Sequence, residues 1–250
     1  MPVPKAKECG VIKLSFAESA PGRDLNDISQ LRRVREPVTR SQSGVRAKVA
    51  DVLSGLSRHA ESQNELKGFQ IIVATARADM WQEQPFTMEY RFNGAKHRYT
   101  PDILLVWDRY REVVEIKDDL EASLPENQDR FALVQELLSE EGYSFRVWRR
   151  SEITAEPRLR NVGIALRYRC IRVSREEREA VRRVFSGTLR STFRRFREGG
   201  ERNVQSIFRL ILDGSLHINW WEPLTLDSGV STIPIGPRVW PFPLSSSCDF

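Results

Sequence analysis

The sequence is poor in cysteine and histidine and has no long apolar run. Its three cysteines, Cys9, Cys170 and Cys248, lie far apart without a C-x-x-C pair, which argues against a disulfide framework and a cysteine zinc site. None of the three histidines has a second His or Cys at ligand spacing. No apolar stretch approaches the roughly 20 residues that a membrane span needs, and residues 1–13 lack the apolar run of a signal peptide. We therefore expect a soluble protein of the reducing cytoplasm, without membrane contact.

Two common catalytic motifs are absent as well. The chain has no glycine-rich loop of the kind that cradles phosphates, so it is not expected to hydrolyse ATP. It also lacks the Ser/His/Asp and Cys/His arrangements of hydrolases that act through a covalent nucleophile. Any catalysis should therefore depend on other polar groups.

The charged residues are unevenly distributed along the 250-residue chain, whose formal net charge is +5. Residues 1–50 contain ten Lys/Arg and five Asp/Glu, and residues 174–209 contain ten Arg and five acidic residues. The stretch between them, 51–173, has a net charge near −2. Basic flanks suit contact with nucleic-acid phosphates, although a solvated surface explains the same charges equally well.

Apolar periodicity predicts a compact α/β unit in the middle of the chain. We expect a helix over about 62–77, strands over 86–92, 99–107 and 111–117, a helix over 127–141 and a strand over 144–149. Asn93-Gly94 directly follows the first strand and predicts a hairpin turn. A helix, three meandering strands, a crossover helix and a last strand make a mixed sheet flanked by helices.

The C-terminal third predicts a second, mainly helical unit. Ser174-Arg-Glu-Glu177 is a capping box that should begin a helix. Further helical patterns lie near 188–197 and 203–213, and 216–219 can form a short strand. Three helices followed by a strand suggest a small winged-helix-like module.

These patterns divide the chain into four parts. The predicted parts are a mobile basic arm over 1–45 with a short helix near 27–34, an α/β domain over 46–173, a small helical domain over 174–232 and an extended tail over 233–250.

The residues most informative about chemistry are Asp102, Glu115 and Lys117. Side chains alternate along a strand, so Glu115 and Lys117 point to the same face of the strand 111–117. If the preceding strand is its neighbour, Asp102 and Glu115 converge on one point. Two carboxylates and a backbone carbonyl, here that of Ile116, form an oxygen-rich site for Mg²⁺ or Mn²⁺, and a lysine beside them can orient water and stabilise charge on a phosphate. The alternative is two strands with ordinary surface charges.

A third carboxylate is expected from the helix that precedes the sheet. Glu65 shares a helical face with apolar residues, and a metal would compensate for its burial. The competing interpretation is that Ser62-Gln-Asn-Glu65 is a capping box, with Glu61 one turn earlier as the substitute acid. Gln128, at the start of the next helix, is a weaker candidate for orienting water or Lys117.

DNA contact is predicted at two further places. His97 lies in the predicted hairpin near Asp102, although a surface role explains it too.

The second place is the helix predicted over 188–197. Its Arg190, Arg194 and Arg197 would share one face and could bind phosphates. A neighbouring face would bury three apolar residues, namely Leu189, Phe193 and Phe196. A solvated face paired with acidic neighbours such as Glu198 and Glu201, or an acidic partner protein, would fit the same arginines.

The order of these motifs resembles a known family. Gln82-Glu-Gln-Pro-Phe86, His97-Arg-Tyr-Thr-Pro-Asp102 and Val114-Glu-Ile-Lys117 together resemble the TnsA endonuclease subunit of heteromeric, Tn7-type transposons, a member of the PD-(D/E)XK nuclease superfamily. The resemblance covers about residues 60–150 well and the C-terminal part loosely. It implies a restriction-endonuclease-like fold with Glu65, Asp102, Glu115 and Lys117 at the catalytic positions.

The resemblance also implies a function. Such subunits nick double-stranded DNA at the 5′ ends of the transposon, while a DDE-type transposase acts on the 3′ ends and an AAA+ ATPase regulator couples both to the target. Two alternatives remain open at this point, a stand-alone restriction or repair nuclease of the same fold and a non-catalytic DNA-binding scaffold.

Overall fold

The computed structural model describes residues 10–16, 47–51, 55–75, 80–107, 110–198 and 200–242. The chain forms two compact units. The first comprises Met1–Ala47, His59–Glu65 and Ala78–Glu152, and the second comprises Lys48–Arg58, Leu66–Arg77 and Ile153–Phe250. The sequence placed a boundary between residues 173 and 174, whereas the second unit already takes up the chain from Ile153.

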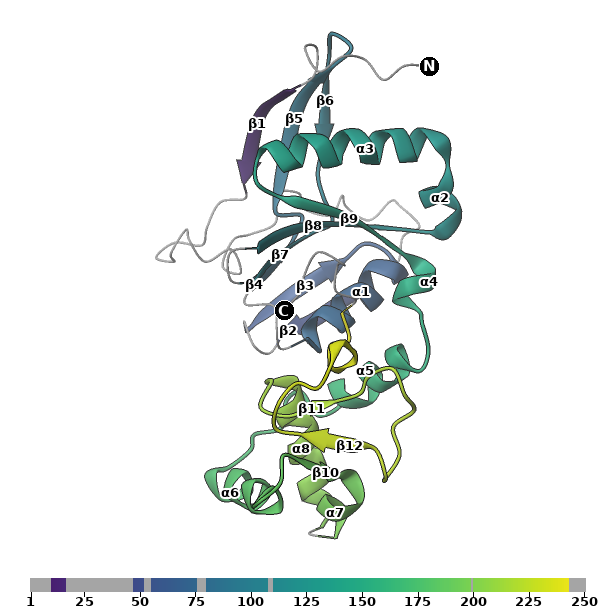
Figure 1. Ribbon diagram of the computed structural model, residues 1–250. Coiled ribbons are helices and arrows are strands. Elements are labelled where there is room, and N and C mark those ends of the chain that lie inside the picture. The colour runs from purple at the N-terminus through teal and green to yellow at the C-terminus, as the bar shows by residue number, and fades with distance from the viewer. Residues whose placement is uncertain are drawn as a thin grey trace. The chain divides into compact units, whose positions relative to one another are not determined.

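An antiparallel three-stranded sheet belongs to the first unit (Figure 1). Its strands stand in the order β1, β5 and β6, and their bounds are Gly10–Phe16, Phe86–Phe92 and Ala95–Tyr99. The turn between β5 and β6 is Asn93-Gly94, and both residues have positive φ, 49° and 77°. This is the conformation that a two-residue hairpin turn requires, so the predicted hairpin is confirmed.

Strand β1 corrects the expectation of a mobile arm over residues 1–45. Gly10–Phe16 pairs along its length with β5, so this part of the predicted arm is ordered in the sheet. From Ile12 to Phe16, apolar and polar residues alternate. This pattern is too brief to be distinguished from coil without the partner strand. The short helix predicted near 27–34 lies outside the described residues.

The second sheet of the first unit contains β4 (Met80–Glu83), β7 (Ile103–Trp107), β8 (Tyr110–Lys117) and β9 (Ser144–Arg149), in that order. Only β8 and β9 run parallel. Parallel neighbours need a crossover connection, which α2 and α3 supply with bounds Asp119–Ser123 and Pro125–Glu140. The mixed α/β architecture agrees with the expected nuclease fold.

The single strand predicted over 99–107 is two strands, β6 and β7, which belong to different sheets. They are separated at Thr100–Asp102, where Pro101 cannot donate a ladder hydrogen bond. The chain makes a matching bend between β4 and β5 at Gln84, whose φ is 41°. The Gln84 amide donates to the Asp102 carbonyl at 2.9 Å, so the two bends are joined and Asp102 is fixed beside them.

The core of the first unit lies between the inner face of β5 and β6 and helix α3, which crosses these strands in Figure 1. Val134, Leu137 and Leu138 of α3 lie in one buried cluster with Phe86 and Met88 of β5. The same cluster includes β7 and β8 residues. One face of β8 is therefore shielded from water, and the polar side chains at the end of this strand lie outside the cluster.

Two strands and a helix are shared between the units. Strands β2 (Ala47–Asp51) and β3 (Leu56–Ala60) form a two-stranded sheet. Helix α1 (Gln63–Val73) follows, close to the helix predicted over 62–77. Its first turn belongs to the first unit and the rest to the second.

The remainder of the second unit is helical with a small sheet. Its helices are α5 (Arg158–Leu166), α6 (Arg175–Val184), α7 (Phe193–Arg197) and α8 (Glu201–Leu212), and the preceding short helix α4 (Arg150–Ile153) ends at the division. Its strands are β10 (Arg190–Thr192), β11 (His217–Ile218) and β12 (Gly229–Ser231), in the antiparallel order β10, β12, β11. The capping box of Ser174 and Glu177 is present at the start of α6, as predicted.

The helix predicted over 188–197 is wrong in its first half. Residues Arg190–Thr192 pair with β12 as a strand, and only Phe193–Arg197 is helical. The hydroxyl of Thr188 accepts a hydrogen bond from the Arg190 amide at 3.3 Å, and such local bonds compete with a helix. Pairing with a strand almost 40 residues later decided the conformation.

The predicted tail contributes to the second unit rather than running free. Pro237–Val239 is a 3₁₀ helix, η2, and Val239 and Phe242 are buried. Residues 243–250 lie outside the described part of the chain. No described helix combines the length and apolar composition needed to cross a bilayer.

Candidate functional site

Asp102 and the end of β8 are held together by a hydrogen bond. The Ile116 amide donates to Asp102 Oδ2 at 2.7 Å. Asp102 directly precedes β7, whose first residue Ile103 is the Cα partner of Val114 in β8. Beyond this pair, β7 is replaced by the bend, and the Asp102 carboxylate takes the place of the next ladder acceptor. Asp102 therefore stands beside Glu115 and Lys117 at the end of β8.

Glu115 is held through both carboxylate oxygens. The Tyr99 hydroxyl donates to Oε2 at 2.8 Å, and Lys117 Nζ lies 3.0 Å from Oε1. Glu115 is 4% exposed and Tyr99 is 9% exposed, so their hydrogen bond is shielded from water. Each carboxylate oxygen has a second lone pair, which leaves acceptor capacity for an added cation.

The electrostatics of Asp102 indicate an excess of negative charge. Burial raises the pKa of Asp102 well above its usual range, and the charges of Glu115 and Glu65 raise it further. The Ile116 amide and Lys117 act in the opposite direction without overcoming these effects. A carboxylate in this position is destabilised when ionised alone and is stabilised by a nearby cation.

Lys117 and Tyr99 respond to the same carboxylates. Burial lowers the pKa of Lys117, but the charges of Glu115 and Asp102 outweigh this effect and leave the pKa raised. Burial raises the pKa of Tyr99 well above its usual value, and the charge and hydrogen bond of Glu115 raise it further. Lys117 is therefore a permanent cation at neutral pH, and Tyr99 is a permanent hydrogen-bond donor.

Glu65 both caps α1 and belongs to the charged surroundings of Asp102. Its amide donates to Ser62 Oγ at 3.1 Å, and its Oε2 accepts from the Glu61 amide at 2.9 Å. Burial raises the pKa of Glu65, while the Glu61 amide and Ser62 lower it. Its charge in turn acts on Asp102. The capping interpretation is thus present in the structure without removing Glu65 from the site.

Glu61 is connected to the bend at Asp102 by Gln84, a residue without a role predicted from the sequence. Gln84 Nε2 donates to Glu61 Oε1 at 3.2 Å, while the Gln84 amide holds the Asp102 carbonyl. Gln84 has a left-handed φ, which is uncommon outside glycine. Such backbone strain is concentrated at functional sites. The Gln-Glu-Gln-Pro motif was the available signal for this residue.

The donor set fits a divalent cation in part. Asp102 and Glu115 offer carboxylate oxygens, and the N–H and C=O of one residue in a ladder point to the same side, so the Ile116 carbonyl faces the side of Asp102. Oxygen donors with net negative charge suit Mg²⁺ or Mn²⁺. Within the described residues, however, no three His, Cys, Asp or Glu side chains form a metal-binding group. The predicted ligand set with Glu65 as third carboxylate is therefore not assembled in advance.

Two weaker candidates occupy other environments. His97 lies in β6, exposed, with its ring stacked on Tyr90 at 5.4 Å between centroids. The Gln128 amide donates to the Ala122 carbonyl at the end of α2. Gln128 thus joins α2 to α3 through this hydrogen bond.

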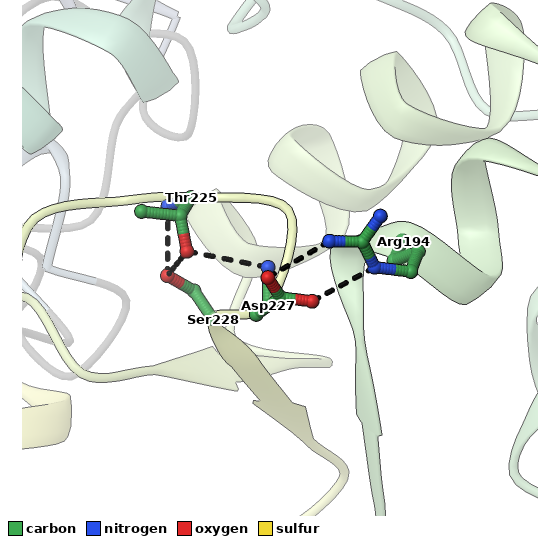
Figure 2. A network of polar contacts seen from close by, with 4 residues as sticks. All are labelled: Arg194, Thr225, Asp227 and Ser228. Carbon is green, nitrogen blue, oxygen red and sulfur yellow. Dashed lines mark hydrogen bonds and ion pairs between the residues drawn. The ribbon is translucent and has the colours of Figure 1, made fainter.

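The predicted arginine face of the second unit does not exist as a helical row. Arg190 lies in β10, while Arg194 and Arg197 lie in α7. Asp227 accepts hydrogen bonds from both Nε and Nη2 of Arg194, at 2.8 Å each (Figure 2). Asp227 itself is fixed by Thr225, whose hydroxyl accepts from the Asp227 amide at 3.2 Å. Arg194 therefore clamps the loop before β12 onto α7, and its planar donor edge is already used.

The burial pattern of this segment also differs from the prediction. Phe193 and Phe196 are buried at 3% and 1% exposure, as expected, but Leu189 is 55% exposed. Leu189 precedes the strand and so does not share a helical face with the two phenylalanines.

Comparison with protein families gives one match. Residues 77–149 match the model described as TnsA-like endonuclease N terminal. No curated protein matches the chain. The matched segment contains Asp102, Glu115 and Lys117 together with Tyr99 and Gln84, while Glu65 lies before it. Residues 77–149, which include most of the mixed sheet that carries these residues, are thus similar to the N-terminal domain of TnsA-like endonucleases.

Proposed function

We propose that the protein hydrolyses DNA phosphodiester bonds with the help of Mg²⁺ or Mn²⁺ and nicks the 5′ ends of a transposon. The observation that carries this proposal is the excess negative charge where Asp102, Glu115 and the Ile116 amide meet, with Lys117 beside it. The matched domain supports the nuclease part of the proposal and, in general terms, a role in Tn7-like transposition.

Asp102, Glu115 and the Ile116 carbonyl would hold the cation, and Glu65 would approach as a further ligand or through a water. A divalent cation bound there would polarise the phosphate and lower the pKa of a bound water. The Tyr99 hydroxyl donates to Glu115 Oε2 and would keep this carboxylate oriented toward a bound cation.

Lys117 supplies the positive charge that the reaction needs. In hydrolysis, the water oxygen bonds to phosphorus, the bond from phosphorus to the leaving deoxyribose oxygen breaks, and a proton returns to that oxygen. Negative charge grows on the phosphate during this exchange. An ammonium fixed 3.0 Å from Glu115 is already oriented to stabilise that charge and to hold the attacking water.

The second unit would connect the nuclease domain to the rest of a transposition assembly. From Arg158 to Ser231 its order is two helices, a strand, two helices and two strands, with β12 between β10 and β11. This arrangement supports a winged-helix-like module. We propose that the protein works with a DDE-type transposase and an AAA+ ATPase regulator, on double-stranded transposon ends.

The test is strand nicking of a duplex that carries a transposon end, with each strand labelled at its 5′ or 3′ terminus. We expect nicking at the 5′ ends in Mg²⁺ or Mn²⁺ and none in EDTA, with the transposase and regulator added when needed. Asp102→Asn should abolish nicking while DNA binding remains. Full cleavage by Asp102→Asn, or by wild type in EDTA, would contradict the proposed chemistry. Cleavage that requires no partner and ignores transposon ends would favour a stand-alone nuclease.

A further inference from the structure

We propose that the outer face of the sheet β1-β5-β6 binds the phosphate backbone of duplex DNA next to the cleavage site. Among the described residues, this basic face consists of Lys13, Arg91, Lys96 and Arg98 with a single acid, Glu89. The inference rests on the proposed function, because the occupant is the DNA substrate itself. It assigns the docking of that DNA to a sheet in the nuclease domain rather than to the basic segments at either end of the sequence.

Strand alternation separates this face from the core. Met88 and Tyr90 of β5 and Tyr99 of β6 point inward and are buried at 0%, 5% and 9% exposure. Glu89 and Arg91 alternate with them and so point outward. Lys13, Arg91, Lys96 and Arg98 are all exposed residues. The cationic groups are thus available on a surface whose reverse side is fixed by packing.

The strand register brings the charges together in two rows. Lys13 is the Cα partner of Glu89, which is in turn the partner of Arg98. The next row pairs Arg91 with Lys96. Directly opposed residues in an antiparallel pair have Cβ atoms about 4.5–5.5 Å apart. Four cations and one carboxylate therefore share a small part of the sheet surface.

The electrostatics of Glu89 report the field on this face. Arg98 donates to Glu89 Oε1 from Nε at 2.9 Å and from Nη2 at 2.7 Å. This hydrogen bonding lowers the pKa of Glu89, and the charges of Arg98, Lys96 and Lys13 lower it further. The one acid on the face is thus neutralised by Arg98, and three cations remain in excess.

The basic face adjoins the site along the chain. Strand β6 leads from Lys96 and Arg98 through Thr100 and Pro101 to Asp102, a path of at most about 20 Å when extended. The Thr87 and Thr100 hydroxyls lie 3.0 Å apart on the outer side where the two strands reach the bend. Cations followed by hydroxyl groups, leading to a carboxylate site, suit a backbone that passes from the sheet to the point of cleavage.

A different explanation accounts for only part of this pattern. Lysines on edge strands prevent sheet-to-sheet aggregation, and β1 and β6 are the edges of this sheet. Arg91, however, lies on the central strand β5, where no unpaired ladder needs protection. Charge complementarity to DNA explains the central and the edge cations together.

The experiment measures DNA binding by the full chain in EDTA, so that no strand is cut. The duplex carries a transposon end, and salt is varied from 50 to 200 mM. The variant Lys13→Gln/Arg91→Gln/Lys96→Gln should lower the slope of log K against log salt by about 0.9 per lost phosphate contact, or about 2.7 for three. The affinity of wild type should accordingly fall about 40-fold more than that of the variant across this fourfold range.

Glu89→Gln is the matched control with the opposite sign. It removes the one acid from the same face and frees Arg98, so DNA affinity and the salt slope should both increase. Light scattering on the triple variant checks that its loss of binding is not aggregation through an exposed edge. An unchanged salt slope in the triple variant, with wild type nicking normally in Mg²⁺, would overturn the basic face alone. A wild type that never nicks would instead count against the proposed function.

Discussion

Asp102 and Asp227 are two carboxylates of one chain that lie in opposite electrostatic situations. Burial and acidic neighbours raise the pKa of Asp102 well above its usual range. Hydrogen bonds from Arg194 lower the pKa of Asp227, which is exposed. Asp227 accepts two hydrogen bonds from Arg194 within its own unit. The Asp102 carboxylate accepts a hydrogen bond from the Ile116 amide and interacts with the charge of Lys117, which also pairs with Glu115. A carboxylate like Asp227 stabilises the fold, and a carboxylate like Asp102 can bind an added cation.

The same contrast separates the two groups of basic residues. Arg194 donates from the planar edge of its guanidinium to Asp227. Lys117, in contrast, is a single cation beside two carboxylates, Glu115 and Asp102. Lys117 remains able to face an incoming phosphate, because an ammonium has three N–H donors and its ion pair with Glu115 does not use all of them. Local pairing, rather than the number of charges in a segment, thus distinguishes a structural cation from one suited to catalysis.

After the loss of nicking expected for Asp102→Asn, the largest effect on the rate is expected from Lys117→Ala. Loss of the cation that stabilises the growing phosphate charge should lower the nicking rate by about 10²–10³-fold. Mn²⁺ binding should become tighter at the same time, because a positive charge near Glu115 is gone. Single-turnover nicking and calorimetric Mn²⁺ titration measure the two effects, with Lys48→Ala, an exposed residue of β2, as the control. Weaker Mn²⁺ binding together with slow nicking would point to collapse of the site instead.

Tyr99→Phe removes one hydroxyl and should have the next largest effect. A partner that orients a metal-binding carboxylate is typically worth about 10–100-fold in metal affinity or activity. We expect a higher Mg²⁺ midpoint for nicking and a smaller rise in Tm on adding Ca²⁺. Tyr143→Phe is the matched control, because Tyr143 lies in the same buried cluster without contacting Glu115. Equal behaviour of the two variants would assign Tyr99 a packing role only.

The sequence predicted the site region far better than the second unit. The strands 86–92 and 144–149 agree with β5 and β9, and Asp102, Glu115 and Lys117 lie together, because alternation and strand order determine their positions locally. Tyr99 was visible in the motif, but its role depends on the bend at residues 100–102. That bend transfers the chain from one sheet to another, which periodicity within a single strand does not reveal.

The errors have long-range causes. Strand β1 depends on pairing with β5, 70 or more residues later, and β10 depends on β12 almost 40 residues later. Arg190 and Arg194 were placed on one helix because local spacing allowed it. A bidentate partner in a distant loop, Asp227, cannot be inferred from such spacing.

The third prediction compares Asp102→Asn with Asp227→Asn as pH changes, in EDTA. The folded pKa of Asp102 is raised above its ordinary 3.8, so the stability tied to its protonated form is lost as pH rises through the folded value. Asp102→Asn should therefore raise Tm at pH 7, by about 2–4 °C for each kcal/mol, and the gain should vanish below pH 3.8.

Asp227→Asn should behave in the opposite way. Its folded pKa is lowered below 3.8, so the stability from its charged form is present above that value and is lost as pH falls through the folded pKa. The variant should lower Tm slightly at pH 7 and match wild type in strong acid. A thermal scan from pH 3 to 8 measures both. Equal signs for the two variants would contradict the contrast between these carboxylates.

The smallest effect is expected from Arg194→Gln. Both partners of the Arg194–Asp227 pair are largely exposed, at 55% and 71% for their side chains, and exposed ion pairs contribute little. We expect a slight fall in Tm that equals that of Asp227→Asn, and the double variant should add little to either. The salt slope of DNA binding should stay at the wild-type value, since the planar edge of Arg194 already binds Asp227. A shallower slope in Arg194→Gln but not in Asp227→Asn would return Arg194 to the phosphate-binding role that the sequence suggested.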